Sequence, residues 1–447
     1  MRALGVRQVT ASIINTTIGG GIFVLPAVAA ATLGAAAPLA YVVCAVLMAL
    51  IVCCFAAAGS RVSLTGGLYA YVEVAFGPFV GFLAGVLYAL MAAFAVASVA
   101  SAFAGSVGAL WSGANARPIR ALLLVALFGG LAAVNVRGVR FGARVIEVMT
   151  AAKLLPLMVF VAAGIWSVNP DFLRWPSMPD PSQIGRAAIV LIFAFVGVEI
   201  ALVPSGEIHD PARTLPRALF LALAITTTLY LLIQATAQGL LGPSMSTYAA
   251  APLAEAASRV LGAGGRVFVL VGAVVSMFGY VSGDMLGSPR AWYAFGRAGV
   301  LPAAMARIHP RYHTPHVAIV VYACIVATLA ISSSFTQLAV LANVAALTLY
   351  LMCVVASFEL QRRDIRSSPE PLRPFDKAQG RPELAEGRRA SWDRPFAMQG
   401  GPVIPVAAAA VILWVLSNAT RREFAVEAAV LAAASLIYSI RRGVGQR

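Results

Sequence analysis

The chain has 447 residues, of which 60% are hydrophobic and 11% are charged, and its mean hydropathy is +0.86. An ordinary soluble domain has about 45–50% apolar and about 25% charged residues, so this composition excludes that class and predicts an integral membrane protein. The formal net charge of +15 would indicate a nucleic-acid partner in a soluble protein, but the positions of the basic residues explain it without one.

Twelve segments are long and apolar enough to cross a bilayer, which takes about 20 largely apolar residues. The connections between them are short, and no soluble domain of even about 50 residues fits into any of them. An attached catalytic domain is therefore excluded, and we do not expect an enzyme. The predicted spans are residues 10–33, 36–58, 79–110, 119–136, 143–166, 184–206, 215–240, 264–288, 316–333, 336–358, 402–417 and 424–440.

The basic residues gather on one side of this predicted topology. If the N-terminus is cytoplasmic, the inner loops and the two termini hold 24 of the 33 Lys and Arg residues, and the outer loops hold 8. The remaining one, Lys153, lies inside the fifth span. Because cytoplasmic loops carry an excess of Lys and Arg, we expect both termini in the cytoplasm of a multi-pass protein of the cell (inner) membrane.

The sequence has no motif for a metal, a nucleotide or another cofactor. His309, His313 and His316 lie close together, but Pro310 and Pro315 prevent them from sharing one helix face, so we expect no metal site. No Walker loop, dinucleotide fingerprint or nucleophile elbow is present. We therefore predict no cofactor and no transport driven directly by ATP.

Three consecutive glycines, Gly19, Gly20 and Gly21, interrupt the first span. Each one costs a helix about 1 kcal/mol, so an unbroken helix is not expected here. In a bilayer, the freed backbone groups need partners in the protein or in a water-filled cavity, which makes a break at mid-membrane depth an indication of a binding site. The alternative is a packing motif, because small residues let membrane helices approach closely.

A second interruption lies in the sixth span, where residues 193–199 (FAFVGVE) are followed by residues 204–207 (PSGE). Two broken spans five positions apart are typical of a five-plus-five inverted repeat, in which the broken helices meet near the bilayer midplane and form the substrate site. The N-terminal end of a half-helix attracts a carboxylate, and C-terminal carbonyls attract an ammonium group. One broken pair therefore suits a zwitterion, and a free amino acid is one.

Four ordered motifs accompany these breaks, in the first span, after span two, at span six and after span eight. They are residues 16–26 (TTIGGGIFVLP), 65–72 (TGGLYAYV) with 76–77 (FG), 193–199 with 207–218 (EIHDPARTLPRA), and 288–290 (SPR) with 293–302 (YAFGRAGVLP) and 314–315 (TP). Together they resemble the amino acid–polyamine–organocation transporter family over most of residues 8–360. The resemblance implies an all-α polytopic membrane protein with twelve transmembrane helices, broken helices 1 and 6, and two C-terminal helices outside the repeat.

At the first break, the resemblance implies backbone contacts with the substrate carboxylate. The N–H groups of Gly20, Gly21 and Ile22 are expected to donate hydrogen bonds to it. Gly19 precedes them in the unwound stretch and is counted with the site. Thr16 occupies a position where relatives often place a small polar residue near the carboxylate.

At the second break, the resemblance implies that the carbonyls of Phe193, Ala194 and Val196 accept hydrogen bonds from the substrate ammonium group. The Phe193 ring occupies a position where an aromatic side chain closes over the bound substrate, and the alternative is an ordinary lipid or core contact. No acidic residue lies in either break itself, so we expect neutral amino acids rather than arginine-like ones.

Lys153 is the candidate for ion coupling. It lies between Ala152 and Leu154 in an apolar span, where an unpaired charge costs several kcal/mol. In several relatives, a lysine at this position occupies the place of the sodium ion in sodium-coupled members of the fold, where it can hold spans one and eight together and exchange a proton. The alternative is that its side chain snorkels to the inner interface.

Two acidic residues complete the predicted coupling or gating set. Glu199 follows the second break and matches an acidic position that takes part in gating and proton sensing in some relatives; the alternative is a carboxyl group that caps nearby backbone. Asp284, in span eight, departs from the family, which usually carries a small polar residue there. It either contacts a cationic substrate or pairs with a basic residue such as Arg290, and we favour the pairing.

The predicted organisation is a ten-helix transport core over residues 1–360, with repeats at about 8–166 and 184–360. Residues 361–400 are polar, charged and rich in proline, and we expect them to form a disordered cytoplasmic loop. Residues 401–447 supply two further transmembrane helices and a short cytoplasmic tail.

The function that these features predict is secondary active transport of amino acids by alternating access, coupled to protons or to exchange. Its partners are the amino acid substrate, membrane lipid and protons. A polyamine or cationic amino acid permease is the alternative within transporters. A membrane-embedded sensor or assembly subunit, which binds an amino acid without moving it, is the alternative from another class.

Overall fold

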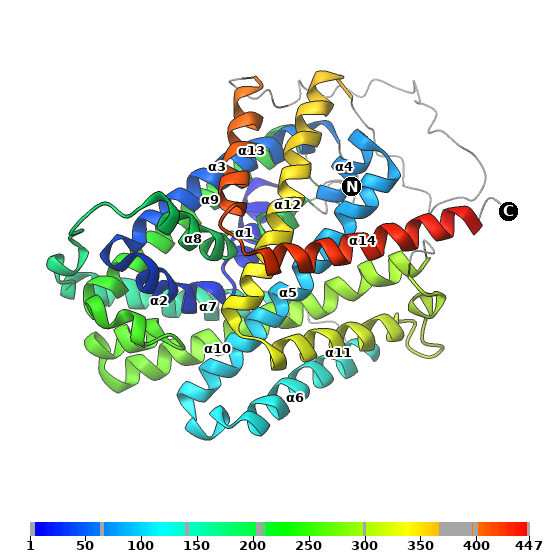
Figure 1. Cartoon of the computed structure of the whole chain (residues 1–447). Helices are drawn as coiled ribbons and strands as arrows, with labels where there is room; N and C mark the ends of the chain where they lie inside the picture. The colour runs from blue at the N-terminus through cyan, green and yellow to red at the C-terminus, as the bar shows by residue number, and fades with distance from the viewer. Residues whose placement is uncertain are drawn as a thin grey trace.

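The computed structural model describes residues 5–62, 67–138, 143–202, 208, 211–297, 301–365, 396 and 401–444. The described residues form helices and contain no β-strand (Figure 1), which confirms the predicted all-α class of membrane protein. Seven described segments are long and apolar enough to cross a membrane. They are Gly21–Arg61, Pro78–Leu110, Arg117–Val136, Ala212–Thr247, Pro252–Arg297, Phe335–Arg362 and Arg421–Ile440. The count of twelve spans stays a prediction.

The helices follow one another in the order of the predicted spans, and the first and sixth spans are each divided. The N-terminal half has α1 (Val6–Thr17), α2 (Gly21–Leu33), α3 (Ala37–Arg61), α4 (Leu68–Phe76), α5 (Pro78–Leu110), α6 (Arg117–Val136) and α7 (Ala143–Gly164). The C-terminal half has α8 (Pro181–Leu191), α9 (Pro211–Leu241), α10 (Pro252–Arg297), α11 (His316–Ser332), α12 (Phe335–Arg362), α13 (Val403–Leu416) and α14 (Arg421–Val444). A non-helical Gly262, with φ 65°, kinks α10.

The centre of the bundle is formed by α5 packed against α12, with α3 packed on α9 and α7 on α10 (Figure 1). Buried polar side chains join these helices through backbone carbonyls. Ser98 Oγ on α5 donates to Phe335 O at 2.8 Å, and Asn343 Nδ2 on α12 donates to Ile189 O at 2.7 Å. Hydrogen bonds of this kind fix helix positions where the hydrophobic effect gives little preference between neighbours.

Two of these helix pairs bear on the predicted repeat. Helices α5 and α12 are the third and tenth predicted spans, and α10 and α7 are the eighth and fifth. In a repeat of five spans, the third span corresponds to the eighth and the fifth to the tenth, so these two pairs are equivalent, and both pack extensively. This pairing is what a five-plus-five arrangement requires. We keep the inverted repeat as a proposal.

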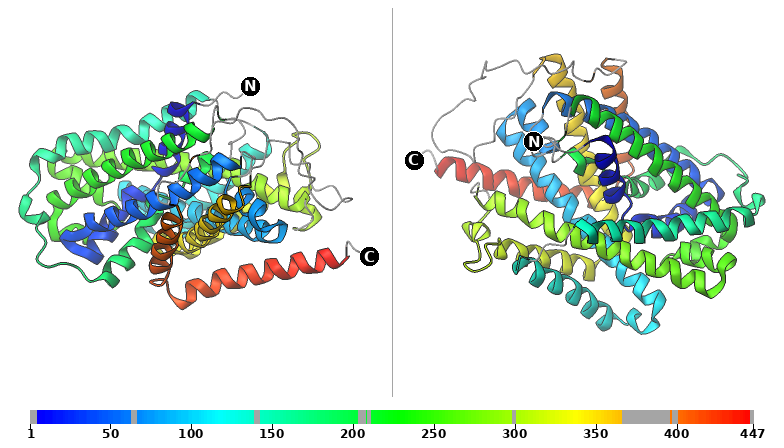
Figure 2. Two further views of the ribbon diagram at one scale, coloured as in Figure 1. Left: turned by 90° about the horizontal axis from the view of Figure 1, so that it is seen from above. Right: turned by 180° about the vertical axis from the view of Figure 1, so that it is seen from behind.

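The outer layers are formed by α6 with α11 and by α14 (Figure 2). α14 lies along the outside of α5 and α12, and only 6% of the residues in its most apolar stretch are buried. The Tyr438 ring stacks on Phe82 with ring centroids 5.2 Å apart and tilts against Phe79 at 5.1 Å. Most of α14 therefore faces outward, and its inner side packs on the core through residues such as Val426 and Leu431 as well as through Tyr438.

Some sequence predictions fall outside the described residues. In the predicted loop of residues 361–400, α12 continues to Arg362, and residues 366–395 and 397–400 lie outside the described part of the chain. The same holds for residues 204–207 of the second predicted interruption and for parts of three motifs, namely residues 65–66, 207 with 209–210, and 298–300.

Candidate functional site

The first break separates α1 from α2. α1 ends at Thr17 and α2 begins at Gly21, and Ile18 between them has φ −78° and ψ 79°, outside the helical region. The first amides of a helix have no acceptor within it, and the helix dipole places partial positive charge on them. The start of α2 can therefore bind an anionic group through its backbone.

Close packing explains why no side chain is present at this break. A Cβ atom on Gly20 would lie 2.9 Å from both Met277 Cγ and Val99 Cγ1, and one on Gly21 would lie 3.1 Å from Phe193 Cδ1. The glycines thus let α5, α10 and the second break approach the backbone of the first. This close packing is compatible with both interpretations of the glycines, as a packing motif and as a binding site.

The second break follows α8, which ends at Leu191. A 3₁₀ turn over Ile192–Ala194 and another over Val198–Leu202 replace the regular helix. Gly197 lies between them with φ +113°, a conformation that favours glycine. A Cβ atom there would lie 3.0 Å from the carbonyl oxygen of Thr16. The two breaks therefore lie directly against each other.

Side-chain hydroxyls join the two breaks. Thr16 Oγ1 lies 3.0 Å from Gly197 O and equally far from the carbonyls of Ser12 and Ile13 on its own helix. Tyr230 OH, on α9, lies 3.2 Å from Thr17 O and 2.9 Å from Ala194 O. Thr16 is thus near the predicted carboxylate position but bonds to backbone. Ala194 O already accepts one hydrogen bond, although a carbonyl has two lone pairs and can accept a second.

A small cavity lies between the breaks. Its volume is about 10 Å³, close to what one water molecule needs. None of the residues that line it carries a charged side chain, and they are Thr16, Thr17, Gly19, Gly20, Gly21, Ala95, Val99, Phe193, Val196 and Tyr280. Six of the eight predicted binding residues are in this set, whereas Ile22 and Ala194 are not.

Phe193 closes one side of the cavity. Its side chain is 7% exposed and packs edge-on against Phe335, with ring centroids 5.6 Å apart. The same ring lies over Gly21. The structure thus brings the predicted aromatic side chain to the first break, where it shields the cavity.

Four lining residues were not predicted as site residues from the sequence: Thr17, Ala95, Val99 and Tyr280. Ala95 and Val99 lie in an apolar stretch of α5 that gives no local signal. Tyr280 gave a sequence signal, because a polar ring one turn before an acidic residue, Asp284, is unusual in a membrane span. In the structure, a Cβ atom on Gly19 would lie 3.2 Å from this ring.

Lys153 lies beside the first break. Its side chain is 7% exposed, and Nζ donates to the carbonyl of Asn15 on α1. From span eight, Ser276 Oγ donates to Gly19 O at 3.2 Å. The end of α1 is therefore held from both α7 and α10. The Lys153 side chain thus reaches the backbone of α1, and the hydrogen bond between the first break and span eight is made by Ser276.

Glu199 is almost completely buried, with 1% of its surface exposed. Its carboxylate accepts hydrogen bonds from the Gly197 amide at 2.9 and 3.1 Å and from Tyr350 OH on α12 at 2.7 Å. The contacts with Gly197 are those of a backbone cap, and the contact with Tyr350 ties the second break to the central helix α12.

Asp284 lies on α10 one turn after Tyr280 and is not among the residues that line the cavity. Its carboxylate accepts hydrogen bonds from Ser288 Oγ at 2.7 Å and from Tyr322 OH at 2.6 Å. Arg290, the partner that we favoured, donates to the carbonyl of Leu286. Asp284 therefore contacts hydroxyl groups that link α10 to α11.

These features define a helical membrane protein whose central site is built from the backbone of two facing half-helix pairs. A sequence model of the amino acid permease family matches residues 4–417, nearly the whole chain. The protein belongs to this family, within the amino acid–polyamine–organocation superfamily, as the motifs predicted. It is an amino acid transporter of the cell membrane by family and not an enzyme.

Bacterial transporters are similar to the chain over most of their length. The uncharacterized transporter Rv1999c of Mycobacterium tuberculosis is 34% identical over 366 residues, which is 78% of this chain and 81% of the relative. The serine/threonine exchanger SteT of Bacillus subtilis is 27% identical over 372 residues, 81% of this chain and 85% of the relative. The branched-chain amino acid permease BcaP of the same organism is 26% identical over 439 residues, 93% and 88% respectively.

Proposed function

We propose that the protein is a secondary active transporter that moves neutral amino acids across the cell membrane by alternating access. One observation carries the proposal: Gly20 and Gly21 at the start of α2 and Phe193 and Val196 of the second break line one cavity. Amides at a helix start attract a carboxylate, and unwound carbonyls attract an ammonium group. A free amino acid presents both groups.

The preference for neutral side chains is supported by the cavity wall. Its residues are small, apolar or hydroxyl-bearing, and none is charged. An arginine-like side chain would have to leave its charge unpaired there, which is costly in a membrane interior. Two relatives, the serine/threonine exchanger SteT and the branched-chain amino acid permease BcaP, are also named for neutral amino acids.

Alternating access is supported by the size of the cavity. A volume of about 10 Å³ is far below the roughly 300 Å³ of the smallest typical ligand pockets. Binding therefore requires the walls to part, and the Phe193 ring between Gly21 and Phe335 is the side chain that has to move. A site that must open in order to fill is consistent with a carrier.

The proposed coupling uses protons or exchange and needs no sodium. Lys153 donates to the carbonyl of Asn15, where its ammonium group takes the role that a bound cation would have beside the break. Glu199 is the second coupling candidate, because it connects the Gly197 amide with Tyr350. We further propose twelve spans with both termini in the cytoplasm.

Reconstituted proteoliposomes test this function. We expect uptake of labelled neutral amino acids under an inward pH gradient or after internal loading with amino acid. No uptake of any amino acid under either condition would reject transport, and saturable binding with zero flux would favour the sensor alternative. Preferential uptake of arginine or of a polyamine would reject the neutral specificity alone.

A further inference from the structure

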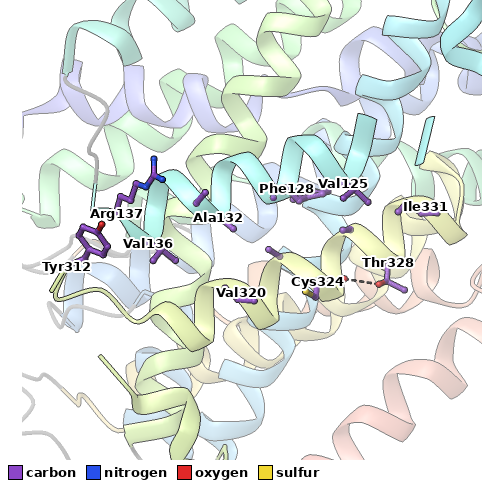
Figure 3. A pocket seen from close by; sticks show the side chains of 14 residues that line it. Val125, Phe128, Ala132, Val136, Arg137, Tyr312, Val320, Cys324, Thr328 and Ile331 are labelled. Atoms are coloured by element: carbon purple, nitrogen blue, oxygen red, sulfur yellow. Dashed lines mark hydrogen bonds between the residues drawn. The ribbon is translucent and has the colours of Figure 1, made fainter. Parts of the chain in front are cut away.

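A larger hollow lies outside the transport site, between α6 and α11 (Figure 3). Its volume is about 640 Å³. Phe128, which is 1% exposed, forms part of its floor, and small residues of α6 such as Gly129 and Ala132 leave the space open. Val320 and Ile331 of α11 line it and are exposed on the outer surface of the bundle. The groove therefore faces the bilayer.

The two ends of the groove differ in polarity. Val125 and Ile331 lie at one end, and Arg137 and Tyr312 lie at the other (Figure 3). Arg137 is the residue that follows α6. A second guanidinium, that of Arg311, lies over the Tyr312 ring at 5.5 Å from its centroid. The groove is thus apolar along its length and cationic at one mouth.

The length of the groove matches one leaflet of a bilayer. From Val125 to Arg137, α6 rises about 18 Å, at 1.5 Å per residue. Half of the hydrocarbon core of a membrane is about 15 Å thick. An acyl chain that starts at the Arg137 end would therefore run along the apolar wall for the depth of one leaflet.

We propose that this groove binds an anionic glycerophospholipid, with an acyl chain between α6 and α11 and the phosphate at Arg137. Charge complementarity selects the headgroup, and the apolar wall accepts the chain. Basic residues mark the cytoplasmic side in the proposed topology, so the lipid comes from the cytoplasmic leaflet. This site is separate from the substrate site and does not depend on the identity of the substrate.

Native mass spectrometry of the purified protein, titrated with phosphatidylglycerol and separately with phosphatidylcholine, tests the headgroup. We expect Arg137→Gln to weaken phosphatidylglycerol binding by about fivefold, the effect of one Arg near an anionic surface, and to leave phosphatidylcholine unchanged. Arg307→Gln is the matched control, because it removes an exposed charge from the connection between α10 and α11 outside the groove. Equal effects of the two substitutions would overturn the headgroup assignment.

A second pair of variants tests the apolar wall. A Cβ atom meets nothing within 4 Å at either Gly129 or Gly130, but only Gly129 lines the groove. We expect Gly129→Leu to reduce the binding of both lipids and Gly130→Leu to leave it unchanged, with both proteins monodisperse. Unchanged lipid binding in Gly129→Leu would overturn the proposal, and so would a dimer in the wild type that Gly129→Leu dissociates, because a second copy would then cover the groove.

Discussion

The two helix breaks differ in which backbone groups the neighbouring side chains engage. At the first break, side chains from α7 and α10 donate to the carbonyls of Asn15 and Gly19, and Tyr230 OH of α9 lies 3.2 Å from Thr17 O. At the second break, the Glu199 carboxylate accepts hydrogen bonds from the Gly197 amide. Donors thus occupy carbonyls at both breaks, because Thr16 Oγ1 and Tyr230 OH also contact Gly197 O and Ala194 O. The second break has in addition an acceptor, the Glu199 carboxylate, on its Gly197 amide.

This difference gives the two breaks opposite polarity toward the cavity. With its carbonyls engaged from outside, the first break presents the amides at the start of α2. With its Gly197 amide engaged by Glu199 and its Ala194 and Gly197 carbonyls contacted by hydroxyls, the second break has the carbonyls of Phe193 and Val196, two residues that line the cavity, to offer a substrate. We infer that each break is shaped by side chains that bind the backbone groups that the substrate does not use.

The largest effect is expected from bulk at the first break. Gly21→Val should lower substrate affinity by more than about a hundredfold, or about 2.7 kcal/mol, because its Cβ already meets Phe193 Cδ1 at 3.1 Å and the side chain would cover the amides. Equilibrium binding of a labelled substrate measures this. Gly130→Val, which adds the same bulk in open space on α6, should bind normally. Normal binding by Gly21→Val would mean that the substrate does not approach this backbone.

The next effect concerns the donor that holds the first break from α7. Lys153→Ala removes the charged donor to Asn15 O and should slow uptake by about tenfold or more, since hydrogen bonds from charged groups contribute about 1.5–3 kcal/mol. The protein should still reach the membrane. Lys377→Ala, at the only other lysine of the sequence, is the charge-matched control.

Sodium dependence sharpens the same point. If the Lys153 ammonium takes the place of a cation, initial uptake rates in sodium and in choline media should agree. A strict sodium requirement, or unchanged uptake in Lys153→Ala, would contradict the coupling role.

A smaller effect is expected at the acceptor of the second break. Glu199→Gln should flatten the pH dependence of uptake, because the amide cannot exchange a proton as the carboxyl group can. Its rate at neutral pH should fall only a few-fold, since the glutamine oxygen can still accept from the Gly197 amide. Glu255→Gln is the control, because the Glu255 carboxylate lies 3.9 Å from the Arg266 guanidinium and forms only a weak ion pair. A normal pH profile with lowered thermal stability would assign Glu199 to backbone capping alone.

The smallest effect is expected where one hydroxyl serves both breaks. Tyr230→Phe removes the contacts with Thr17 O and Ala194 O and should raise KM by about threefold, in line with about 0.6 kcal/mol for a hydrogen bond in a membrane protein. Tyr41→Phe is the control: Tyr41 packs against Tyr230, and its hydroxyl has no hydrogen-bond partner among the described residues. Equal effects of both substitutions would show that the contact between the breaks is unimportant.

The sequence predicted the class, the family and the positions of both breaks, because hydrophobic span length and runs of glycine act locally. Gly19, Gly20 and Gly21 disfavour a helix whatever the surrounding fold. In the second break, Gly197 allows the backbone to leave the helical conformation. Lys153 was identifiable because a charge in an apolar span needs a partner.

The sequence could not predict which side chains meet across the bundle. Val99 lines the cavity because α5 packs against the break, and nothing in its own neighbourhood indicates this. Thr16 bonds to Gly197 O, and Asp284 accepts from Ser288 and Tyr322. These partners are set by tertiary packing between segments far apart in the chain.

Competition binding with a substrate amino acid, its amide and its decarboxylated amine tests the opposite polarity of the two breaks most directly. If the backbone N–H groups of α2 bind the substrate carboxylate, the amino acid amide and the decarboxylated amine should compete at least about tenfold more weakly than the amino acid itself. This corresponds to a difference in binding free energy of about 1.4 kcal/mol. Full competition by the amine would contradict this, because the carboxylate would then contribute nothing at the first break and close packing alone would explain its glycines.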